Sequence, residues 1–344
     1  MSAPVASPPR PDVLHTWDLS DAGFADLLAS AERLAGGAGR EPLLAGARAA
    51  ALFLAPSLRT RASFEIACHD LGAHPLVITP GQGSWDFEHR DDVPMTGAAA
   101  EHVREAVPVL GTMVDALAVR AFASLTDARA DAADELLAAV ARAANVPVLN
   151  LESAIDHPHQ GLSDALCLRR TFAGEPVRVA FTWAPHIKPL PRAVPHAALA
   201  ALVRDGHEVT LCHPPGFELD PDVLARVTAG AQARGGELRV THDRAEALQG
   251  AQVVYAKSWG RADLYGDAAA GAAAVSHTST RAAWRVSPAD LAAGARFMHC
   301  LPVRRDVVVD AAVLDSPASL VLSQAACRLP VQKATLCRAL GVSP

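Results

Sequence analysis

The stretch Ala49–Glu65 (AAALFLAPSLRTRASFE) joins an apolar segment, a polar turn and the start of a helical pattern. The apolar run Ala49–Ala55 has the length of a buried strand and ends at Pro56. A helical pattern starts near Arg61, so the turn consists of Ser57, Leu58, Arg59, Thr60 and Arg61. Such a turn directs free backbone N–H groups and the positive end of the helix dipole toward a bound group. With two hydroxyls and two guanidiniums, it predicts a site for a dianionic phosphate.

The alternative is that Arg59 and Arg61 are solvated charges at the start of a helix. Positive charge at that end opposes the helix dipole. The placement therefore favours an anion site over a solvated surface.

The bulk composition limits the classes of function. At 344 residues the chain is long enough for two domains. Charged residues make up 20% and the net charge is −6, which predicts no partnership with nucleic acid or a membrane surface. Six scattered cysteines without a C-x-x-C pair indicate reduced thiols and a cytoplasmic location. Neither a signal peptide nor a membrane span is predicted.

Strand-like and helical patterns alternate along the whole chain, which predicts an α/β protein with parallel sheets flanked by helices. The predicted strands of the first half are Ala49–Ala55, Pro75–Thr79, Ala116–Phe122 and Val146–Leu151. Those of the second half are Val177–Trp183, Glu208–His213, Leu238–His242, Gln252–Ala256 and Phe297–Leu301. The predicted helices are Arg61–Leu71, Ala99–Met113, Asp127–Ala143, Pro191–Arg204, Asp220–Arg234, Arg244–Leu248 and Ser287–Ala293.

We therefore expect two domains, at residues 1–150 and 151–322, with the active site between them. A helix over Gly161–Thr171 bridges them, and a last helix over residues 323–340 returns to the first domain. Residues 79–95 and 259–285 show no clear period and are expected to be long loops.

Charged or imidazole groups follow nearly every predicted strand. Ligands bind at the carboxyl ends of parallel strands, so these groups predict an enzyme. They are Arg59, Arg120, Glu152, His157, His186, Lys257, His299 and Arg304. Motifs for ATP hydrolysis, nicotinamide redox and serine hydrolysis are missing.

Two alternative chemistries have weaker support. His157 and His159 could bind zinc, but no third ligand has a recognisable spacing. His299 and Cys300 are adjacent on a strand, so their side chains point to opposite faces and do not form a catalytic pair.

Three motifs occur in order: Ser57-Leu58-Arg59-Thr60-Arg61, His157-Pro158-x-Gln160 and His299-Cys300-Leu301-Pro302. Together they resemble the aspartate/ornithine carbamoyltransferase superfamily. Further features are similar to its N-acylornithine branch, which comprises the N-succinyl- and N-acetylornithine carbamoyltransferases. These features are Trp85, Thr182-Trp183 with His186, Lys188-Pro189-Leu190-Pro191, Tyr255-Ala256-Lys257-Ser258-Trp259 and Arg328-Leu329-x-Val331-Gln332-Lys333.

The resemblance implies a role for each matching residue. Residues implied to bind carbamoyl phosphate are Ser57, Leu58, Arg59, Thr60, Trp85, Arg120, His157, Gln160, Cys300, Leu301 and Arg328. Arg59, Thr60, Arg120 and His157 of this set are implied to be catalytic. The acylated ornithine is implied to bind Glu152, His186, Lys257, Leu301 and Arg304. No metal or cofactor is implied, and the expected partners are the two small substrates.

Two implied properties concern the assembly and the chain path. Trp85 would reach a neighbouring subunit's site, which implies a homotrimer. The loop Ala184–Pro195 would be threaded by Lys257–His277, which implies a deep trefoil knot in the second domain. The general rule against knots gives no support for it, so this expectation rests on the resemblance alone.

The acyl group depends on few positions. The acetyl branch has a glutamate, and the succinyl branch a proline, where this chain has Ala100. Alanine leaves space and no repelling charge, and the spacing from Glu152 to His157 also resembles the succinyl branch. We therefore expect N-succinylornithine as the acceptor, in arginine biosynthesis. N-acetylornithine and a non-catalytic anion-binding role are the alternatives. Leu58 and His159 replace a methionine and a cysteine that are common in the family.

Overall fold

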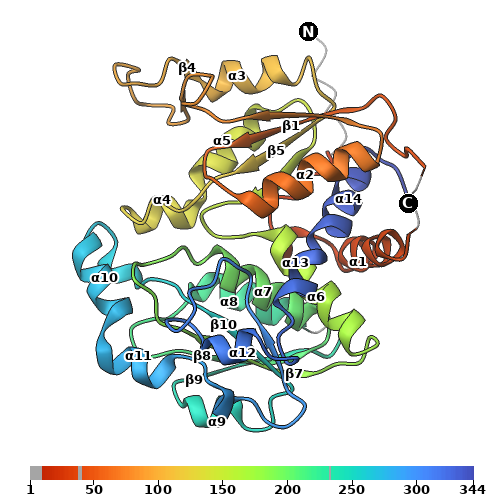
Figure 1. Cartoon of the computed structure of the whole chain (residues 1–344). Helices are drawn as coiled ribbons and strands as arrows, with labels where there is room; N and C mark the ends of the chain where they lie inside the picture. Colours follow the sequence, from red (N-terminus) through yellow and green to blue (C-terminus); the bar gives the residue numbers. More distant parts are fainter. Residues whose placement is uncertain (1–9, 38–40, 232–233) are drawn as a thin grey trace.

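The computed structural model describes residues 10–37, 41–231 and 234–344. It has two α/β units, one above the other in Figure 1, each built on a parallel sheet. The α/β fold class and the parallel sheets flanked by helices are confirmed. Among the described residues, no helix is sufficiently long and apolar to span a membrane.

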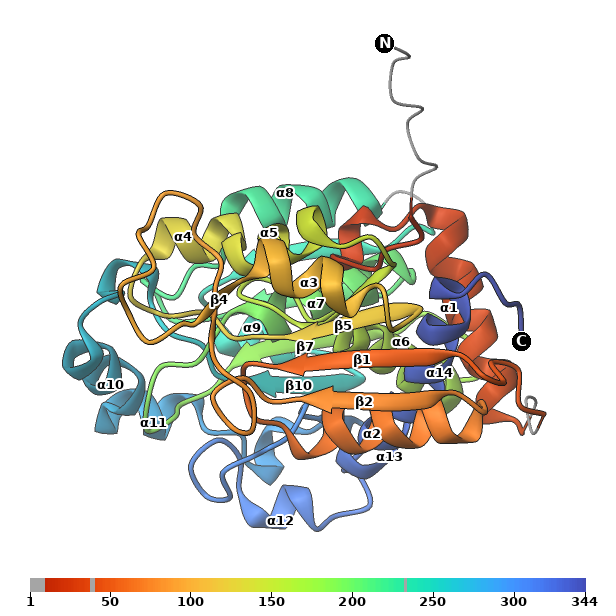
Figure 2. The same cartoon turned by 90° about the horizontal axis from the view of Figure 1, so that it is seen from above.

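The first sheet has the strand order β2-β1-β5-β6. Its strands are β1 (Arg48–Phe53), β2 (His74–Ile78), β5 (Ala116–Arg120) and β6 (Val148–Glu152). Successive residues of β1 face opposite sides: Ala51 and Phe53 join the core beneath α2 (Leu58–Asp70), and Leu52 joins a second core. That second core is formed with α3 (Val103–Leu110) and α5 (Glu135–Ala143). Figure 2 shows these helices on the two faces of the sheet.

The second sheet has the order β11-β10-β7-β8-β9, and all its pairings are parallel. Its strands are β7 (Arg178–Trp183), β8 (Glu208–Cys212), β9 (Glu237–Thr241), β10 (Val253–Lys257) and β11 (Arg296–Met298). The helices α7 (Ala193–Arg204), α8 (Pro221–Gly230), α9 (Arg244–Leu248) and α12 (Ala311–Leu314) belong to this unit. All nine predicted strands are thus present.

Helix α6 (Pro158–Thr171) connects the two units, and its residues from Pro158 to Leu168 are all buried. It packs against α7, and also against α1 (Asp21–Ala35) and α14 (Arg328–Ala339). Figure 1 shows α14 returning to the first unit, where it lies beside α1 and α2. The final helix is in two parts, α13 (Val321–Ala326) and α14, separated at Cys327.

Several predicted helices were wrong in extent. The helix over Ser287–Ala293 is only the short turn η4 (Pro288–Asp290), closed by a capping box between Ser287 and Asp290. The helix over Asp127–Ala143 is two helices, α4 (Ala128–Ala133) and α5, because Asp134 between them is left-handed at φ 50°. Its carboxylate accepts hydrogen bonds from Ser153 and the Ala154 N–H, which fixes this break.

The long segments also contain regular structure. The helix predicted over Ala99–Met113 starts only at Val103, because β4 (Glu101–His102) pairs with β3 (Phe87–Glu88). Residues 259–285 contain η3 (Ala262–Leu264), α10 (Ala268–Ser276) and α11 (Thr278–Trp284). Helix α10 consists mostly of alanine and glycine, so its sequence has no amphipathic period and the helix was not predicted.

The Pro-rich loop after β7 lies against the later segment that follows β10. His186 N–H donates to Val275 O at 3.0 Å, and Gly260 N–H donates to Leu190 O at 3.0 Å. At Gly260 a Cβ atom would come within 2.7 Å of Pro189 Cβ, so the close approach requires glycine. These contacts bring together the two segments that the expected knot involves, and the threading itself stays a prediction.

Candidate active site

A cleft of about 750 Å³ lies where the carboxyl ends of both sheets meet. Both units contribute to it, as the sequence analysis expected of an enzyme between two domains. Of the predicted site residues, the cleft collects Ser57, Leu58, Arg59, Thr60, Arg120, Glu152, His157, Gln160, His186, Lys257, Cys300, Leu301, Arg304 and Arg328.

The turn after β1 is the start of helix α2. Ser57 is its N-cap, and its hydroxyl accepts from the Thr60 N–H at 3.2 Å. Pro56 ends the apolar run, and Leu58 is the first helical residue. The helix therefore starts three residues before the predicted Arg61, and Leu58, Arg59 and Thr60 belong to its first turn. An anion here would face the free N–H groups of that turn.

Three guanidiniums and the Thr60 hydroxyl form the polar centre of the cleft. Thr60 Oγ1 accepts from Arg328 Nη2 at 3.0 Å and from Arg120 Nη1 at 3.3 Å. With both lone pairs in use, the hydroxyl proton of Thr60 is free to donate to a ligand. Burial lowers the pKa of Arg59, and burial with the neighbouring Arg120 lowers that of Arg328 to about 10. Glu152 is the one carboxylate in the lining, and it pairs with Arg120.

His157 is a neutral hydrogen-bond donor in this arrangement. Burial, and then the charges of Arg328 and Arg120, hold its pKa well below its usual range. Arg328 Nη1 lies 3.2 Å from His157 Nε2. A guanidinium can only donate, so Nε2 is the acceptor and the ring proton is on Nδ1.

Three buried donors of this cluster have no partner among the described residues: Arg120 Nε, His157 Nδ1 and Arg328 Nε. Buried polar atoms are normally hydrogen-bonded. Three unpartnered donors in one cationic cleft therefore indicate a missing anionic or carbonyl-bearing ligand.

A second group of polar side chains forms the other end of the cleft. Arg304 Nε donates to His186 Nε2 at 3.2 Å, while His186 Nδ1 donates to Lys188 O at 2.9 Å. Burial and the charge of Lys257 lower the pKa of His186, so it is a neutral acceptor. Lys257 lies at the end of β10, and its side chain also lines the cleft.

The segment after β11 lines the cleft with Cys300, Leu301, Pro302, Val303 and Arg304, and the Cys300 thiol is not activated. Burial raises the pKa of Cys300, which opposes thiolate formation. His299 Nδ1 accepts from the Leu301 N–H at 3.0 Å, so the imidazole is engaged with the backbone. Leu301 itself is left-handed, with φ 54°. This geometry matches the inference that His299 and Cys300 are no nucleophile pair.

Three predicted residues lie outside this cleft. Arg61, expected at the phosphate, instead donates to Glu65 at 2.9 Å one helical turn away and is half exposed. Trp85 and Ala100 belong to the extension around β3 and β4, where Trp85 Nε1 donates to Glu101 at 2.6 Å. The expected role of Trp85 at a neighbouring subunit's site and that of Ala100 in acyl specificity both stay predictions.

The cleft also contains residues that the sequence reasoning did not assign. They are Pro56, Phe122, Lys188, Leu190, Pro191, Val194, Pro302 and Val303. Arg120 lies over the Phe122 ring at 4.9 Å. Lys188 was visible only as part of a Pro-rich motif, and its position on a long loop gave no indication that it faces the ligand side.

His159 has a structural role. Its Nδ1 donates to Asn150 O at 2.9 Å, and its Nε2 accepts from Thr335 Oγ1 at 2.8 Å. It therefore ties α6 to β6 and α14, on the side away from His157. Among the described residues, no group of three or more His, Cys, Asp or Glu side chains is placed to hold a metal ion.

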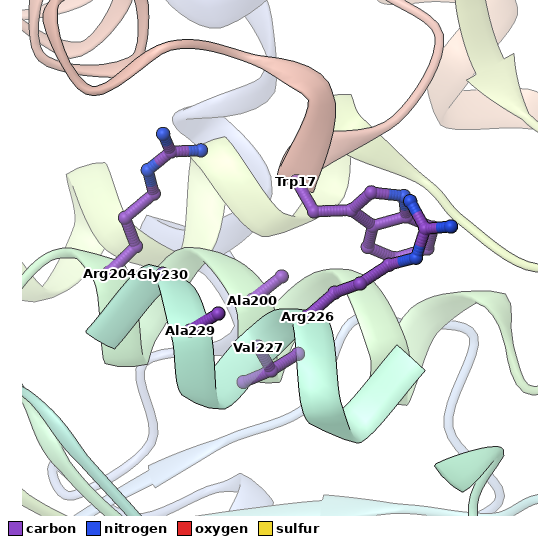
Figure 3. A pocket seen from close by; sticks show the side chains of 7 residues that line it. All are labelled: Trp17, Ala200, Arg204, Arg226, Val227, Ala229 and Gly230. Atoms are coloured by element: carbon purple, nitrogen blue, oxygen red, sulfur yellow. The ribbon is translucent and has the colours of Figure 1, made fainter. Parts of the chain in front are cut away.

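Figure 3 shows a smaller hollow of about 230 Å³, lined from η1 (Thr16–Asp18), α7 and α8. Its lining includes no carboxylate, imidazole or thiol. The Arg204 guanidinium there already donates to Asp21 and to the carbonyls of Thr16 and Leu19. This hollow offers no chemistry comparable to that of the cleft.

Comparison with known proteins agrees with the geometry of the cleft. Residues 11–170 match the carbamoyl-phosphate binding domain of aspartate/ornithine carbamoyltransferases, and residues 192–339 match their Asp/Orn binding domain. The chain belongs to this family. It is a carbamoyltransferase.

The relatives include both acyl branches. An N-acetylornithine carbamoyltransferase of Xanthomonas campestris is 38% identical over 87% of this chain and 89% of its own length. An N-succinylornithine carbamoyltransferase of Bacteroides fragilis is 34% identical over 80% and 82%. The crystal structure of an N-acetyl-L-ornithine transcarbamylase with one glutamate changed to alanine has a TM-score of 0.90 and 37% identity. The match covers 96% of this chain and 99% of that one, which is complexed with carbamyl phosphate and N-succinyl-L-norvaline.

Proposed function

We propose that this enzyme transfers the carbamoyl group of carbamoyl phosphate to the side-chain amine of N2-succinyl-L-ornithine. The products are N-succinyl-L-citrulline and phosphate, in arginine biosynthesis. The observation that carries the donor assignment is the cationic cluster at Thr60, with unpartnered donors at Arg120, His157 and Arg328. Relatives that act on acylated ornithine support the acceptor class.

The proposed reaction needs no covalent enzyme intermediate. The amine attacks the carbamoyl carbon, a tetrahedral oxyanion forms, and the C–O bond to phosphate breaks. Arg59, Arg120, Thr60 and the Nδ1–H of His157 are donors for the developing negative charge. The leaving phosphate can accept the proton that the amine loses. Holding both substrates in one cleft supplies the remainder of the rate enhancement.

The acceptor end is cationic, which favours an acceptor with two carboxylates. Lys188, Lys257 and Arg304 line this end, and no salt bridge with a carboxylate of the described chain is found for any of them. An N-succinyl group adds a second carboxylate, whereas an N-acetyl group adds none. The resemblance places Ala100 where the acetyl branch has a glutamate. An N-acetyl-L-ornithine transcarbamylase in which one glutamate is replaced by alanine was crystallised with an N-succinyl ligand.

For Ala100 to affect specificity, it must act on a neighbouring subunit's site, because it lies outside the cleft of its own chain. The same holds for Trp85, which is 57% exposed. We therefore propose a homotrimer in which the β3–β4 extension completes the adjacent cleft.

The test is a side-by-side assay of citrulline-type product with N-succinyl- and N-acetyl-L-ornithine. The expected result is faster turnover of the succinyl substrate, and A100E should reverse the preference while A100S, the matched control, should keep it. Faster turnover of the acetyl substrate by the native enzyme would overturn the succinyl assignment. No turnover of either, with carbamoyl phosphate still bound, would support the non-catalytic alternative.

A further inference from the structure

Asp164 is a fully buried carboxyl group that none of the roles above uses. It lies on α6, one turn after Gln160, and its exposed fraction is 0%. Three side chains donate to it: Gln160 Nε2 at 2.7 Å, Gln324 Nε2 at 2.7 Å and the Tyr255 hydroxyl at 2.9 Å. Burial raises its pKa to about 7, and the three donors oppose that rise.

The direction of these hydrogen bonds follows from the outer partners. Gln160 Oε1 accepts from Arg328 at 2.8 Å, and Gln324 Oε1 accepts from the His299 N–H at 3.0 Å. A guanidinium and a backbone amide can only donate, so both glutamines must turn their NH₂ groups toward Asp164. Asp164 therefore acts as the common acceptor of both amides.

The two glutamines lead to opposite walls of the donor pocket. Gln160 connects Asp164 to Arg328 and, through it, to Thr60 at the start of α2. Gln324 connects Asp164 to the backbone at His299, which precedes the cleft residues Cys300 and Leu301. One carboxylate thus links residues of the first unit, the second unit and the returning helix α13.

We propose that Asp164 is a positioning residue that holds the two walls of the carbamoyl-phosphate pocket in register through Gln160 and Gln324. This inference rests on the proposed function, because it takes carbamoyl phosphate as the ligand of the pocket. Asp164 touches no substrate. It sets where the Arg328 guanidinium and the Cys300-Leu301 backbone lie before the donor binds, which lowers the cost of ordering them on binding.

The decisive variant is Asp164→Leu, which has a similar volume and removes the Oδ1 atom that accepts from both glutamines. The KM for carbamoyl phosphate should rise by about tenfold or more, while the KM for the acceptor should change by less than about twofold. Tyr255→Phe is the matched control, because it removes the Tyr255 hydroxyl, which donates to Asp164 Oδ2 and accepts from Gln324 at 3.1 Å, while each glutamine keeps its own hydrogen bond to Asp164 Oδ1. It should lower the melting temperature and leave the carbamoyl-phosphate KM within about twofold.

A double-mutant cycle separates positioning from general stability. If Asp164 acts through the two glutamines, Asp164→Leu should add less than about threefold to the KM effect of the combined variant Gln160→Ala/Gln324→Leu. If the effects of the variants on the carbamoyl-phosphate KM are independent and multiply, the proposal is wrong. If Asp164→Leu does not fold, Gln324→Leu tests the second wall, and a native carbamoyl-phosphate KM in that variant would equally contradict the proposal. A native enzyme without carbamoyl transfer would refute the proposed function instead.

Discussion

Replacing Arg328 by methionine should separate binding of the donor substrate from stability of the fold. Arg328 is buried, and its guanidinium donates to Thr60 at 3.0 Å and to Gln160 at 2.8 Å. Its Nε has no partner among the described residues. Methionine keeps an unbranched apolar stem and removes the charge. We expect R328M to fold and to lose most of its carbamoyl-phosphate activity.

The stability effect is the difference of two opposing contributions. Burial and the nearby Arg120 lower the Arg328 pKa from 12.5 to about 10, and one pKa unit is about 1.4 kcal/mol. At neutral pH the guanidinium is charged in both the folded and the unfolded state. Keeping this charge buried therefore lowers the free energy of unfolding by about 3 kcal/mol, and R328M removes this cost. Two hydrogen bonds from a charged donor, each worth about 1.5–3 kcal/mol, are lost. The net destabilisation should therefore lie between about 0 and 3 kcal/mol.

The effect on activity has no such compensation. The unpartnered Nε can donate one charge-assisted hydrogen bond to the donor substrate, and losing one worth about 1.5–3 kcal/mol predicts a fall in kcat/KM for carbamoyl phosphate of roughly 10-fold to 150-fold. The measurements are product formation with carbamoyl phosphate varied, and the melting temperature with and without inorganic phosphate. The matched control is R304M, at the acceptor end of the same cleft. It should weaken acceptor binding and keep the donor KM. A folded R328M whose kcat/KM stays within about threefold of native would refute this account of the cluster.

Three further predictions follow from single contacts. R59A should lower carbamoyl-phosphate turnover by about two or more orders of magnitude in the same assay, and unchanged turnover would contradict the phosphate assignment of the turn after β1. Burial lowers the His159 pKa to about 3, so below pH 6.5 the unfolded chain binds a proton at this residue and the folded chain does not. Between pH 7.5 and pH 5, the unfolding free energy of H159Q should therefore fall by about 2 kcal/mol less than that of the native protein, as measured by urea titration. An equal fall in both proteins would exclude this cause. D205N should lower the free energy of unfolding by about 3 kcal/mol, because the buried Asp205 pairs with Arg169 and Arg234. None of these three residues lines the cleft, so the KM for carbamoyl phosphate should stay unchanged. A changed KM would show that this ion-pair group is coupled to the site.

Sequence patterns predicted the strands better than the helices. The central strands are short apolar runs bounded by turn residues, as in Ala49–Ala55 before Pro56, and burial on both faces makes that pattern distinct. The helix boundaries were missed where tertiary contacts override local preference. Asp134 breaks a helix because its carboxylate is held by Ser153, which is distant in sequence.

The donor half of the site was predictable from the order of strands and the residue after each one. Arg120, His157 and Arg59 follow separate strands, and a parallel sheet brings such positions together. Arg61 shows the limit of this reasoning. Its neighbour Arg59 reaches the cleft, whereas helical geometry places Glu65 one turn beyond Arg61, and the two pair on the surface. Asp164 was missed because a buried carboxyl group has no signature in a helical pattern.

The cleft concentrates positive charge, and this favours binding of the anionic donor substrate before the acceptor. Three guanidiniums of Arg59, Arg120 and Arg328 face one carboxylate of Glu152, and burial, together with the neighbouring Arg120, lowers the pKa values of Arg59 and Arg328. A dianionic phosphate supplies the missing negative charge and the acceptors that the unpartnered donors lack. Until it binds, the same cations are free to attract a carboxylate of the acceptor into the wrong end of the cleft. Occupation by carbamoyl phosphate should remove that competition, so we expect ordered binding with the donor first, and equal affinity for the acceptor with and without bound donor would contradict this expectation.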